Sequence, residues 1–357
     1  MKDNLFTSLN LAGQYLKNRL VVAPMCQYSA ENGEPSIWHR RHLGTLAISG
    51  AGMLVVESTA VSLEGRISLK DLVLENDNQQ SAFSTMLNEI KTLSDIPIVL
   101  QISHAGRKGS VNVPWHNHGT SLNSNEGGWK TMSSSSIPRD KDWPTPRQMN
   151  LDDIRKTVTD FELTTRRACL SGFQGVEIHM AHGYLLHQFL SPISNQRKDQ
   201  FGGSFQNRCR FPLQIVQSLR DILPENRFLG VRLTGDDCMD EGWTIEDCMR
   251  FAFELKSCGV SYVCISSGGI VPVTNLKLGP CYQVHLAEKV KKAVQIPTRT
   301  AGFITTPFQA DTIIRSGSAD MVAIGRQLIR EPWFALRAAN ELSTKFIVPN
   351  QYRRCLP

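Results

Sequence analysis

The chain lacks the cysteine pattern of a metal or disulfide protein. Its nine cysteines are an odd number, they are scattered between positions 26 and 355, and no two have the C-x-x-C spacing. That spacing is typical of zinc ribbons and iron–sulfur clusters, so neither is indicated. Scattered thiols in a chain of 357 residues fit a reducing compartment better than a disulfide scaffold.

Long apolar runs and blocks of charge are also missing. No uninterrupted apolar stretch reaches the length of about 18 residues that a membrane helix needs, and residues 1–18 contain neither a long apolar core nor a cleavage motif. Lys and Arg are dispersed and the net charge is only +6, which gives little support to nucleic-acid or membrane binding. We therefore expect a cytoplasmic protein with small-molecule partners and a slight attraction for anionic cofactors.

What the chain does contain is a short apolar run followed by a longer amphipathic segment, repeated eight times. The strand-like runs lie at residues 20–23, 53–57, 97–102, 175–179, 228–233, 262–266, 296–300 and 321–324. Helical patterns lie at residues 151–171, 207–223, 244–258, 282–294, 307–315 and 332–342. Eight such units without a break in composition predict an α/β fold with one domain over residues 1–357, a (β/α)8 TIM barrel. A doubly wound sheet, which alternates in the same way, is the alternative.

Several of these helices begin with a capping residue. We expect caps at Asp152 or Asp153, at Thr244 with Asp247, and at Thr306, which precedes a proline. Each cap would mark the point where a loop at the end of a strand turns into the next helix.

Two segments do not follow the alternation. Residues 103–150 contain three tryptophans and several prolines but no clear helix. A loop of this length in a compact domain is commonly functional, so we interpret it as a long loop or lid inserted after the third strand, with a variable excursion packed on the barrel as the alternative. Residues 345–357 form a C-terminal tail without a helical pattern, which is expected to fray or to dock elsewhere.

The residues best suited to chemistry follow the fourth predicted strand. His179 ends this strand, His182 comes three residues later, and Tyr184 comes two residues after that. Two imidazoles at this spacing can offer two N–H donors to one carbonyl or nitro oxygen, and a phenol beside them can protonate the neighbouring carbon. Barrel enzymes carry their chemistry at the C-terminal ends of the strands, where these residues fall.

The same two histidines permit a second hypothesis, a metal-dependent barrel hydrolase. Histidines three residues apart can chelate zinc, but the site needs a third ligand. Glu177 is a candidate because strand alternation turns it to the same side as His179. The residues that follow His182 are Tyr and aliphatics rather than carboxylates, so we expect no metal.

Three further strand ends carry polar side chains that would line the barrel mouth. Cys26 and Tyr28 follow the first strand, Gln101 lies near the end of the third, and Arg232 near the end of the fifth. Cys26 and Tyr28 can equally be packing residues. The amide of Gln101 can both donate to and accept from a flat heterocycle. The guanidinium of Arg232 needs an anion, which is either a ligand or a structural partner such as Glu177.

A phosphate site is indicated at the last two strands. Gly302 follows the seventh strand, and Gly325 and Arg326 follow the eighth. Barrels often bind phosphate at these two loops, because glycine lets backbone N–H groups approach the anion and arginine adds charge.

With these residues assembled, the chain resembles the Old Yellow Enzyme family of FMN-dependent ene-reductases from about Leu5 to Arg354. Within it, the chain is most similar to the thermophilic-like branch of YqjM-type and xenobiotic reductase A-like members. The motifs that carry the resemblance are residues 23–26 with Tyr28, residues 57–61, Gln101 with residues 104–108, residues 179–185, 190–192, 199–204 and 207–208, and the groups 325–326 and 330–332. Each motif is weak alone, and their order along the chain is specific.

The resemblance implies a set of residues for FMN. The isoalloxazine would be held by Ala23, Pro24, Met25, Cys26, Ala60, Gln101 and Arg232, and the phosphate by Gly302, Gly325 and Arg326. Arg232 would lie near the N1–C2=O edge of the ring, where reduced flavin gathers negative charge. This position would supply the anion that the barrel arginine needs.

The resemblance also implies roles for the substrate residues. His179 and His182 would bind the activating oxygen with help from Tyr28, and Tyr184 would deliver the proton. Cys26 would tune the flavin and contact the substrate. Phe303 occupies a pocket position where some relatives carry Trp, and Arg354 aligns with an arginine that reaches into a neighbouring subunit of a homodimer or homotetramer. The Trp that often ends related chains is missing here.

The implied reaction is ping-pong reduction of activated alkenes. NADPH or NADH would give a hydride to the flavin and leave, and an α,β-unsaturated carbonyl, or a nitro compound, would take it in the same place. A non-catalytic FMN-binding protein is a further alternative, which predicts bound flavin without turnover. Relatives that carry an iron–sulfur cluster have a cysteine motif that this chain lacks.

Overall fold

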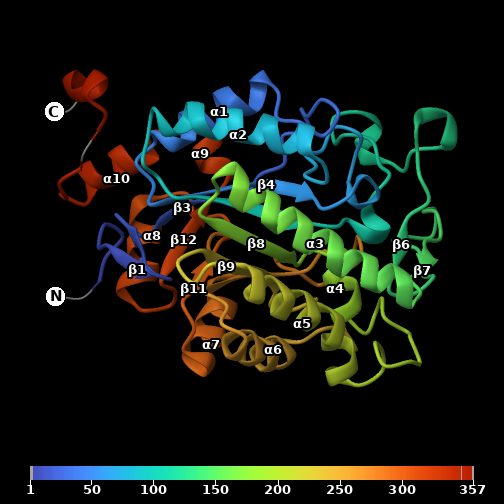
Figure 1. Ribbon diagram of the computed structural model, residues 1–357. Helices are drawn as coiled ribbons and strands as arrows, with labels where there is room; N and C mark the ends of the chain where they lie inside the picture. The colour runs from blue at the N-terminus through green and yellow to red at the C-terminus, as the bar shows by residue number, and fades with distance from the viewer. Residues whose placement is uncertain (1–2, 347, 356–357) are drawn as a thin grey trace.

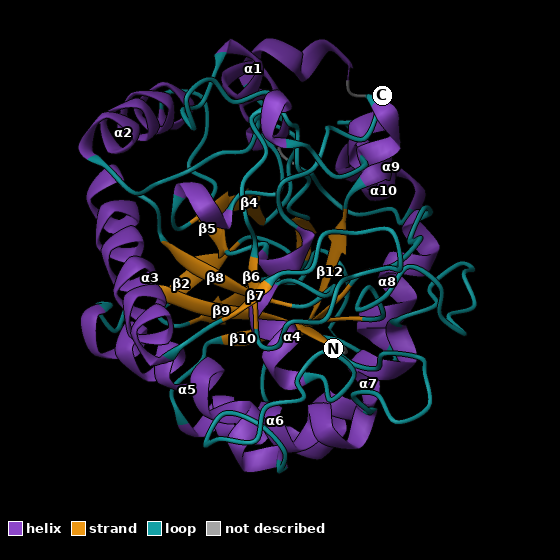
Figure 2. Ribbon diagram, turned by 90° about the vertical axis from the view of Figure 1, so that its right-hand side faces the viewer, coloured by secondary structure: helices purple, strands orange, loops and turns teal. Residues whose placement is uncertain are grey.

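Eight parallel strands close into a barrel in the computed structural model, which describes residues 3–346 and 348–355. The strands follow one another around the barrel in chain order, and the last pairs with the first. They are β3 (Leu20–Val22), β4 (Met53–Ala60), β5 (Ile98–Ser103), β8 (Gly175–Met180), β9 (Phe228–Thr234), β10 (Tyr262–Ser266), β11 (Thr298–Thr300) and β12 (Met321–Ile324). Figure 2 shows them almost end-on, surrounded by helices. The predicted barrel is therefore confirmed, and the doubly wound sheet is wrong.

Helices connect the strands on the outside of the barrel (Figure 1). They are α1 (Ile37–Ala47), α2 (Asp77–Lys91), α3 (Leu151–Ser171), α4 (Leu185–Leu190), α5 (Phe205–Ile222), α6 (Ile245–Ser257), α7 (Val284–Val294), α8 (Pro307–Arg315), α9 (Arg326–Arg330) and α10 (Phe334–Glu341). The caps at Thr244 and Thr306 are confirmed, since each side chain accepts from the N–H three residues on. The cap predicted at Asp152 or Asp153 is wrong. Asn150 occupies that position, and Asp153 completes a capping box with it.

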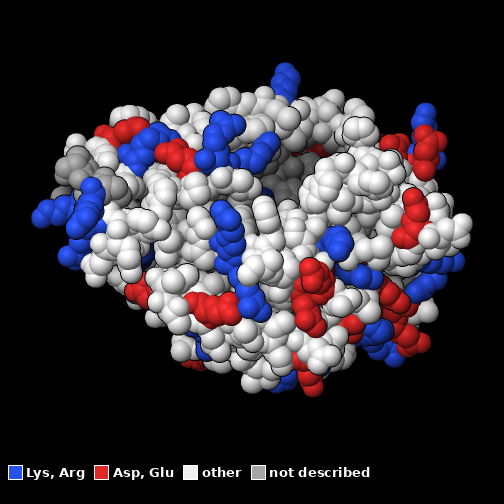
Figure 3. Space-filling view, turned by 90° about the horizontal axis from the view of Figure 1, so that it is seen from above, with Lys and Arg blue, Asp and Glu red and all other residues white. Residues whose placement is uncertain are grey.

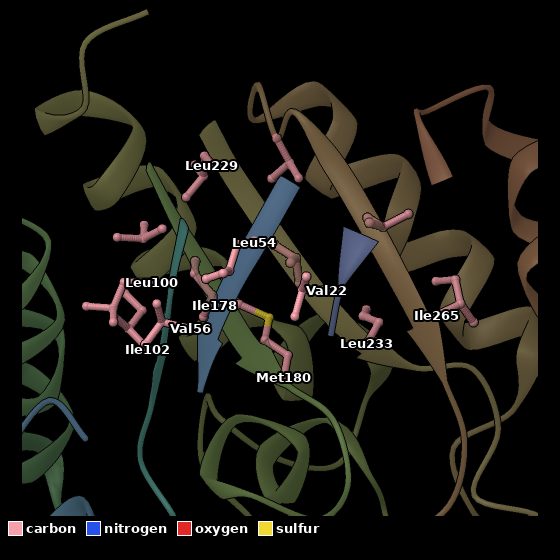
Figure 4. Close-up of a cluster of buried hydrophobic side chains, with 14 of the residues drawn as sticks. Val22, Leu54, Val56, Leu100, Ile102, Ile178, Met180, Leu229, Leu233 and Ile265 are labelled. Atoms are coloured by element: carbon pink, nitrogen blue, oxygen red, sulfur yellow. The ribbon is translucent and has the colours of Figure 1, made fainter. Parts of the chain in front are cut away.

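Most of the strands carry apolar side chains on both faces because each face packs against a different layer. Val22 and Leu54 belong to the large cluster between the strands and the surrounding helices, part of which is drawn in Figure 4. Their sequence neighbours Val21 and Met53 belong to a second cluster inside the barrel. Successive side chains of a strand point to opposite faces, so continuous apolar runs are what a doubly covered sheet requires.

A hairpin before the first barrel strand contributes to the inner cluster. It consists of β1 (Leu9–Leu11) and β2 (Gln14–Leu16), paired antiparallel. Leu11 and Leu16 are buried and pack with the interior side chains. In Figure 1 the hairpin lies at the left end of the barrel, opposite the end where β6 and β7 lie. It therefore covers the end away from the C-terminal mouth.

Residues 103–150 run across the mouth without an α-helix. The segment contains the 3₁₀ turns η2 (Gly106–Lys108), η3 (Asn117–Gly119) and η4 (Ser124–Glu126), and the two-residue strands β6 (Met132–Ser133) and β7 (Arg147–Gln148). In Figure 2, β6 and β7 lie in front of the barrel opening. The ring of Trp115 makes an edge contact with Tyr28 at 5.9 Å, so the segment reaches the predicted site.

The tail differs from the expectation that it contains no helix. Residues Asn350–Cys355 form the 3₁₀ helix η5, which packs through Tyr352 on Trp333. Arg354 is exposed on this helix. Residues 347, 356 and 357 of the predicted tail lie outside the described residues.

The surface agrees with the dispersed charge of the sequence. Figure 3 shows Lys and Arg side chains interspersed with Asp and Glu over one face of the molecule. In the ranges that the structure describes, no helix combines the length and the apolarity needed to cross a membrane.

Candidate active site

Strand register brings the predicted site residues together at the mouth. His179 on β8 pairs with Arg232 on β9. Two residues further on, Thr234 of β9 pairs with Ser266 of β10. These positions lie at the C-terminal ends of their strands, where a TIM barrel builds its active site.

The two histidines contact each other. Nε2 of His179 lies 3.3 Å from Nδ1 of His182, and the rings meet edge to face at 5.1 Å. Nε2 of His182 lies 2.5 Å from Oγ of Ser266. Burial, reinforced by the positive charge of Arg232, holds the pKa of both imidazoles well below its usual range. Both rings are therefore neutral at neutral pH, and each carries a single N–H.

The loop that carries His182 has an unusual backbone. His182 adopts φ +59°, and Gly183 follows with φ +75°. A Cβ at Gly183 would lie 2.2 Å from the carbonyl oxygen of Gly269, and a Cβ at Gly269 would lie 2.7 Å from Cα of His182. Glycine is therefore required on both sides, because the β8 and β10 loops touch backbone to backbone.

Lys108 joins the same two loops. Its Nζ donates to the carbonyl oxygen of His182 at 2.6 Å and to that of Gly269 at 3.3 Å. Nζ also lies 4.9 Å from the ring centre of Tyr184. Burial, together with the charges of Arg139 and Arg107, lowers the pKa of Lys108 to about 7. Lys108 is therefore a mouth residue whose charge changes near neutral pH.

Tyr184 lies beside the histidines in an apolar setting. Its ring contacts His179 at 4.8 Å, and like Cys26, Tyr28 and Trp143 it packs against one small cluster of buried apolar side chains. Burial raises the pKa of the Tyr184 phenol well above its usual range, and it raises the pKa of the Cys26 thiol and of Tyr28 in the same way. All three groups therefore keep their protons at neutral pH, which is the state that a proton donor needs.

Glu177 does not pair with Arg232. Its carboxylate accepts from Gln101 and Tyr262, each at 2.8 Å, and forms a fully buried ion pair with Arg299. The structural partner suggested for Arg232 is therefore wrong. Nε of Arg232 is buried without a hydrogen-bond partner, and in the described parts of the chain no carboxylate lies within ion-pair distance of it.

The same contacts bear on the metal hypothesis. Glu177, the proposed third ligand beside His179 and His182, is held by Arg299 inside the barrel. Over residues 3–346 and 348–355, no three His, Cys, Asp or Glu side chains gather in a way that could hold a metal ion. The metal-dependent hydrolase therefore lacks its ligand set.

A hollow of about 750 Å³, partly open to solvent, lies at the mouth beside Arg232. The predicted residues that line it are Ala23, Pro24, Met25, His182, Arg232, Gly302, Phe303, Gly325 and Arg326. The predicted residues that do not line it are Cys26, Tyr28, Ala60, Gln101, His179, Tyr184 and Arg354. Gln101 is buried and donates to Glu177, and Cys26 and Tyr28 pack against the same small apolar cluster as Tyr184.

The lining suits a phosphorylated flat ligand. A Cβ at Gly302 would meet Tyr282 at 3.0 Å, and one at Gly325 would meet Met25 at 3.1 Å, so glycine keeps this wall open. The guanidinium of Arg326 lies over the Phe303 ring at 4.3 Å, at the same wall. Arg232, which has no carboxylate partner, and Arg326 both line the hollow, so its wall can accept a negatively charged ligand.

Four residues of the mouth are not predicted as site residues from the sequence. They are Lys108, Ser266, Tyr282 and Gln283. Ser266 ends a predicted strand and Lys108 follows one, so the rule that strand ends carry chemistry would have found both. Tyr282 and Gln283 lie at the start of α7, and no motif distinguishes them.

Comparisons with known proteins agree with this site. The family model for NADH:flavin oxidoreductase / NADH oxidase matches residues 4–345. NADPH dehydrogenase of Geobacillus sp. (strain WCH70) is 36% identical over 356 residues, which cover 99% of each chain.

Two solved structures share the fold. Morphinone reductase in complex with tetrahydroNAD has a TM-score of 0.77 at 24% identity, with 98% of this chain and 93% of that chain covered. 2-Naphthoyl-CoA reductase has a TM-score of 0.85 at 22% identity; the match covers 96% of this chain but spans about half (53%) of that longer chain. The protein therefore belongs to the NADH:flavin oxidoreductase / NADH oxidase family, the Old Yellow Enzyme family that its motifs resemble, and is a flavin-dependent oxidoreductase.

Proposed function

We propose that this protein is an FMN-dependent NADPH or NADH oxidoreductase that reduces the C=C bond of α,β-unsaturated carbonyls, and nitro compounds as well. The observation that carries the proposal is Arg232, a mouth arginine whose buried Nε has no partner and which lines the hollow. Arg232 is half-buried, and a cation in that position without a counter-charge is destabilising, so a ligand that concentrates negative charge there would offset the cost.

FMN would use the two ends of the hollow. Arg232 would lie beside its ring, and Gly302, Gly325 and Arg326 would hold its phosphate through backbone N–H groups and charge. When bound, FMN supplies the hydride-transfer chemistry that connects a nicotinamide donor to an alkene acceptor. Ala60 and Gln101 are buried and do not line the hollow, and Gln101 would reach the ring from its position beside Glu177.

The neutral histidines would activate the substrate. His179 and His182 lie side by side, and their low pKa values keep them as neutral hydrogen-bond donors rather than cations. Donors aimed at the carbonyl oxygen stabilise the enolate charge that develops as the β-carbon is reduced. Tyr184, which keeps its proton and touches His179, would protonate the α-carbon.

The remaining predicted residues complete the proposal. Cys26 would contact substrate and flavin as a neutral thiol, and Tyr28 would help to bind the oxygen. Phe303 would bound the substrate space, and residues 103–150 would act as a lid. Arg354, exposed on η5, would reach the site of a second subunit in a cytoplasmic homodimer or homotetramer.

Anaerobic absorbance spectroscopy of the purified protein tests the reaction class. We expect a flavin band that NADPH bleaches and that 2-cyclohexenone restores. Bleaching without return would remove the ene-reductase assignment, and a band that neither NADPH nor NADH bleaches would leave a non-catalytic FMN-binding protein. Absence of a flavin band after incubation with FMN would overturn the proposal.

Tyr184→Phe tests the proton donor. Because the phenol acts only on the alkene, we expect enone reduction to slow about 100-fold while flavin reduction by NADPH stays nearly unchanged. Tyr15→Phe, at an exposed position of the β2 strand, is the matched control and should change neither rate. Equal loss of both half-reactions in Tyr184→Phe would exclude it as the donor.

Substitution of both histidines, His179→Ala with His182→Ala, tests the oxygen site. The double variant should lose affinity for phenol and for 2-cyclohexenone, because both ligands would be held by the two N–H groups. Unchanged affinity for both ligands would remove the histidines from the substrate site.

A further inference from the structure

Ser266 and Thr234 hold His182 from two neighbouring strands. The two residues pair in register at the ends of β10 and β9. Thr234 accepts from the backbone N–H of His182 at 3.0 Å, and Oγ of Ser266 lies 2.5 Å from its ring Nε2. The backbone and the ring of His182 are therefore each held by a hydroxyl, and the hydroxyl of Ser266 is the one that contacts a titratable nitrogen of the His182 ring.

The tautomer of His179 follows from its own hydrogen bond. Nδ1 of His179 accepts from the backbone N–H of Ala181 at 3.2 Å. The neutral ring therefore carries its proton on Nε2, which faces Nδ1 of His182 at 3.3 Å. In this arrangement Nδ1 of His182 accepts and its proton lies on Nε2, directed at Ser266. The ring then offers no N–H to a ligand.

The hydroxyl of Ser266 can reverse this arrangement, since it can donate as well as accept. The amide of Gln283 lies 3.1 Å from this hydroxyl and also 3.1 Å from the backbone N–H of Ser267. A backbone N–H can only donate, so the amide oxygen of Gln283 faces this group. The hydroxyls of Ser267 and Tyr282 lie 3.0 and 2.9 Å from the same oxygen. Gln283 therefore stays satisfied when the hydroxyl of Ser266 turns away from it.

We propose that Ser266 is a positioning residue that sets the tautomer of His182. When its hydroxyl donates to Nε2, His182 carries its proton on Nδ1, on the side of His179. The Nε2–H of His179 and the Nδ1–H of His182 then both face one substrate oxygen. In this tautomer change His182 loses the proton on Nε2 to solvent and takes up a proton from solvent on Nδ1, before the substrate binds. The ring is neutral in both forms, so the charge of the site stays the same.

This inference rests on the proposed function, because it requires an oxygen ligand between the histidines. The test uses the flavin-loaded protein labelled with ¹⁵N-histidine, and phenol as the probe ligand. The ¹⁵N resonances of His182, identified by their loss in His182→Ala, report which ring nitrogen carries the proton. We expect Nε2–H without phenol and Nδ1–H with phenol.

Two variants separate positioning from structure. Ser266→Ala should weaken phenol binding about fivefold to tenfold, the effect of one neutral hydrogen bond, and should leave His182 as a mixture of tautomers. Ser266→Thr keeps a hydroxyl and should restore both properties. Ser267→Ala, which removes a neighbouring hydroxyl of the same Gln283 cluster, should leave the tautomer unchanged.

The outcomes distinguish this inference from the proposed function. A wild-type protein that turns over 2-cyclohexenone but keeps Nε2–H on His182 with phenol bound overturns the role of Ser266 alone. So does a Ser266→Ala protein that binds phenol like the wild type. If the flavin band of the wild-type protein is not bleached by NADPH and restored by 2-cyclohexenone, the proposed function is wrong instead. Because the tautomer is read first in the wild-type protein, the test does not depend on the variants folding.

Discussion

Arg299 and Arg232 lie on either side of Cys264 in the register of the barrel, on β11 and β9, yet their surroundings differ. Both have buried guanidinium nitrogens without hydrogen-bond partners, so unsatisfied donors do not distinguish them. Arg299 is fully buried and neutralised by Glu177, whereas Arg232 lines the hollow and has no carboxylate partner in the described chain. The counter-charge, and not the register, therefore distinguishes the arginine of the barrel interior from the arginine that lines the hollow.

The largest expected effect comes from breaking the interior pair. Glu177→Leu should destabilise the protein by about 3 to 5 kcal/mol, because it leaves the charge of Arg299 buried and uncompensated. Urea unfolding measures the change. The double variant Glu177→Leu with Arg299→Met should recover most of the loss, since two apolar side chains need no counter-charge. Equal stability of the single and double variants would mean that the ion pair is not what holds Arg299.

At the mouth, the matched change should affect binding instead. Arg232→Met should lower FMN affinity about 10-fold to 100-fold, the effect of losing a charged hydrogen bond of roughly 1.5 to 3 kcal/mol. Its unfolding free energy without flavin should change by less than about 1 kcal/mol, because no ion pair is broken. Fluorescence titration of the flavin-free protein with FMN gives the affinity. An unchanged affinity together with a large loss of stability would make Arg232 a second interior arginine.

Lys108 extends the comparison of Arg299 with Arg232 to a third cation, which lies at the mouth. Burial there lowers its pKa, so Lys108 can become neutral by losing a proton and needs no counter-ion. Its pKa of about 7 is below the ordinary value of 10.5, so between these values the unfolded chain binds more protons than the folded one. Stability contributed by this group therefore rises with pH above 7. The unfolding free energy of the wild type relative to Lys108→Met should increase by about 2 kcal/mol from pH 7 to pH 9. A pH-independent difference would place Lys108 among the ordinary surface lysines.

The smallest effect is expected at the rim of the mouth. Trp115, an exposed residue of the 103–150 segment, makes an edge contact with Tyr28. Trp115→Ala should raise the KM for 2-cyclohexenone about threefold with little change in kcat or stability, as loss of one aromatic contact of about 0.5 to 1.5 kcal/mol implies. Steady-state kinetics measure it, and Tyr15→Ala at the far end of the barrel serves as the control. An unchanged KM would argue against a lid at this position.

The sequence predicts the barrel well because its strands are buried on both faces. Runs such as those that became β10 and β12 match to the residue, since nothing polar interrupts them. The α3 cap was misplaced because Asn150 and Asp153 are both good capping residues, and only the backbone shows which one lies outside the helix. Helices α1 and α2 are not among the helices predicted from the sequence, although both begin with a capping residue, Ser36 and Asn76.

The site was less predictable because its contacts are long-range. Strand ends identified His179, Arg232 and Tyr184, whose residue types suggest chemistry. The sequence could not show that Glu177 forms an ion pair with Arg299, which is 122 positions away. Nor could it show that Ser266 contacts His182, which is 84 positions away. A lone serine gives no signal of its own. Only the register of adjacent strands assigns it a partner.

The closure of the barrel sets a constraint on how the chain is made. β3 pairs with β12 through Val22 and Ile324, so the first barrel strand meets its second neighbour only after about 300 further residues have been synthesised. At roughly 5 to 20 residues per second, this takes about 15 to 60 seconds. During that interval one edge of β3 is open to other chains, as is the inner surface that Leu11 and Leu16 finally cover. The stage most exposed to aggregation is therefore the nascent chain, before its last strand leaves the ribosome.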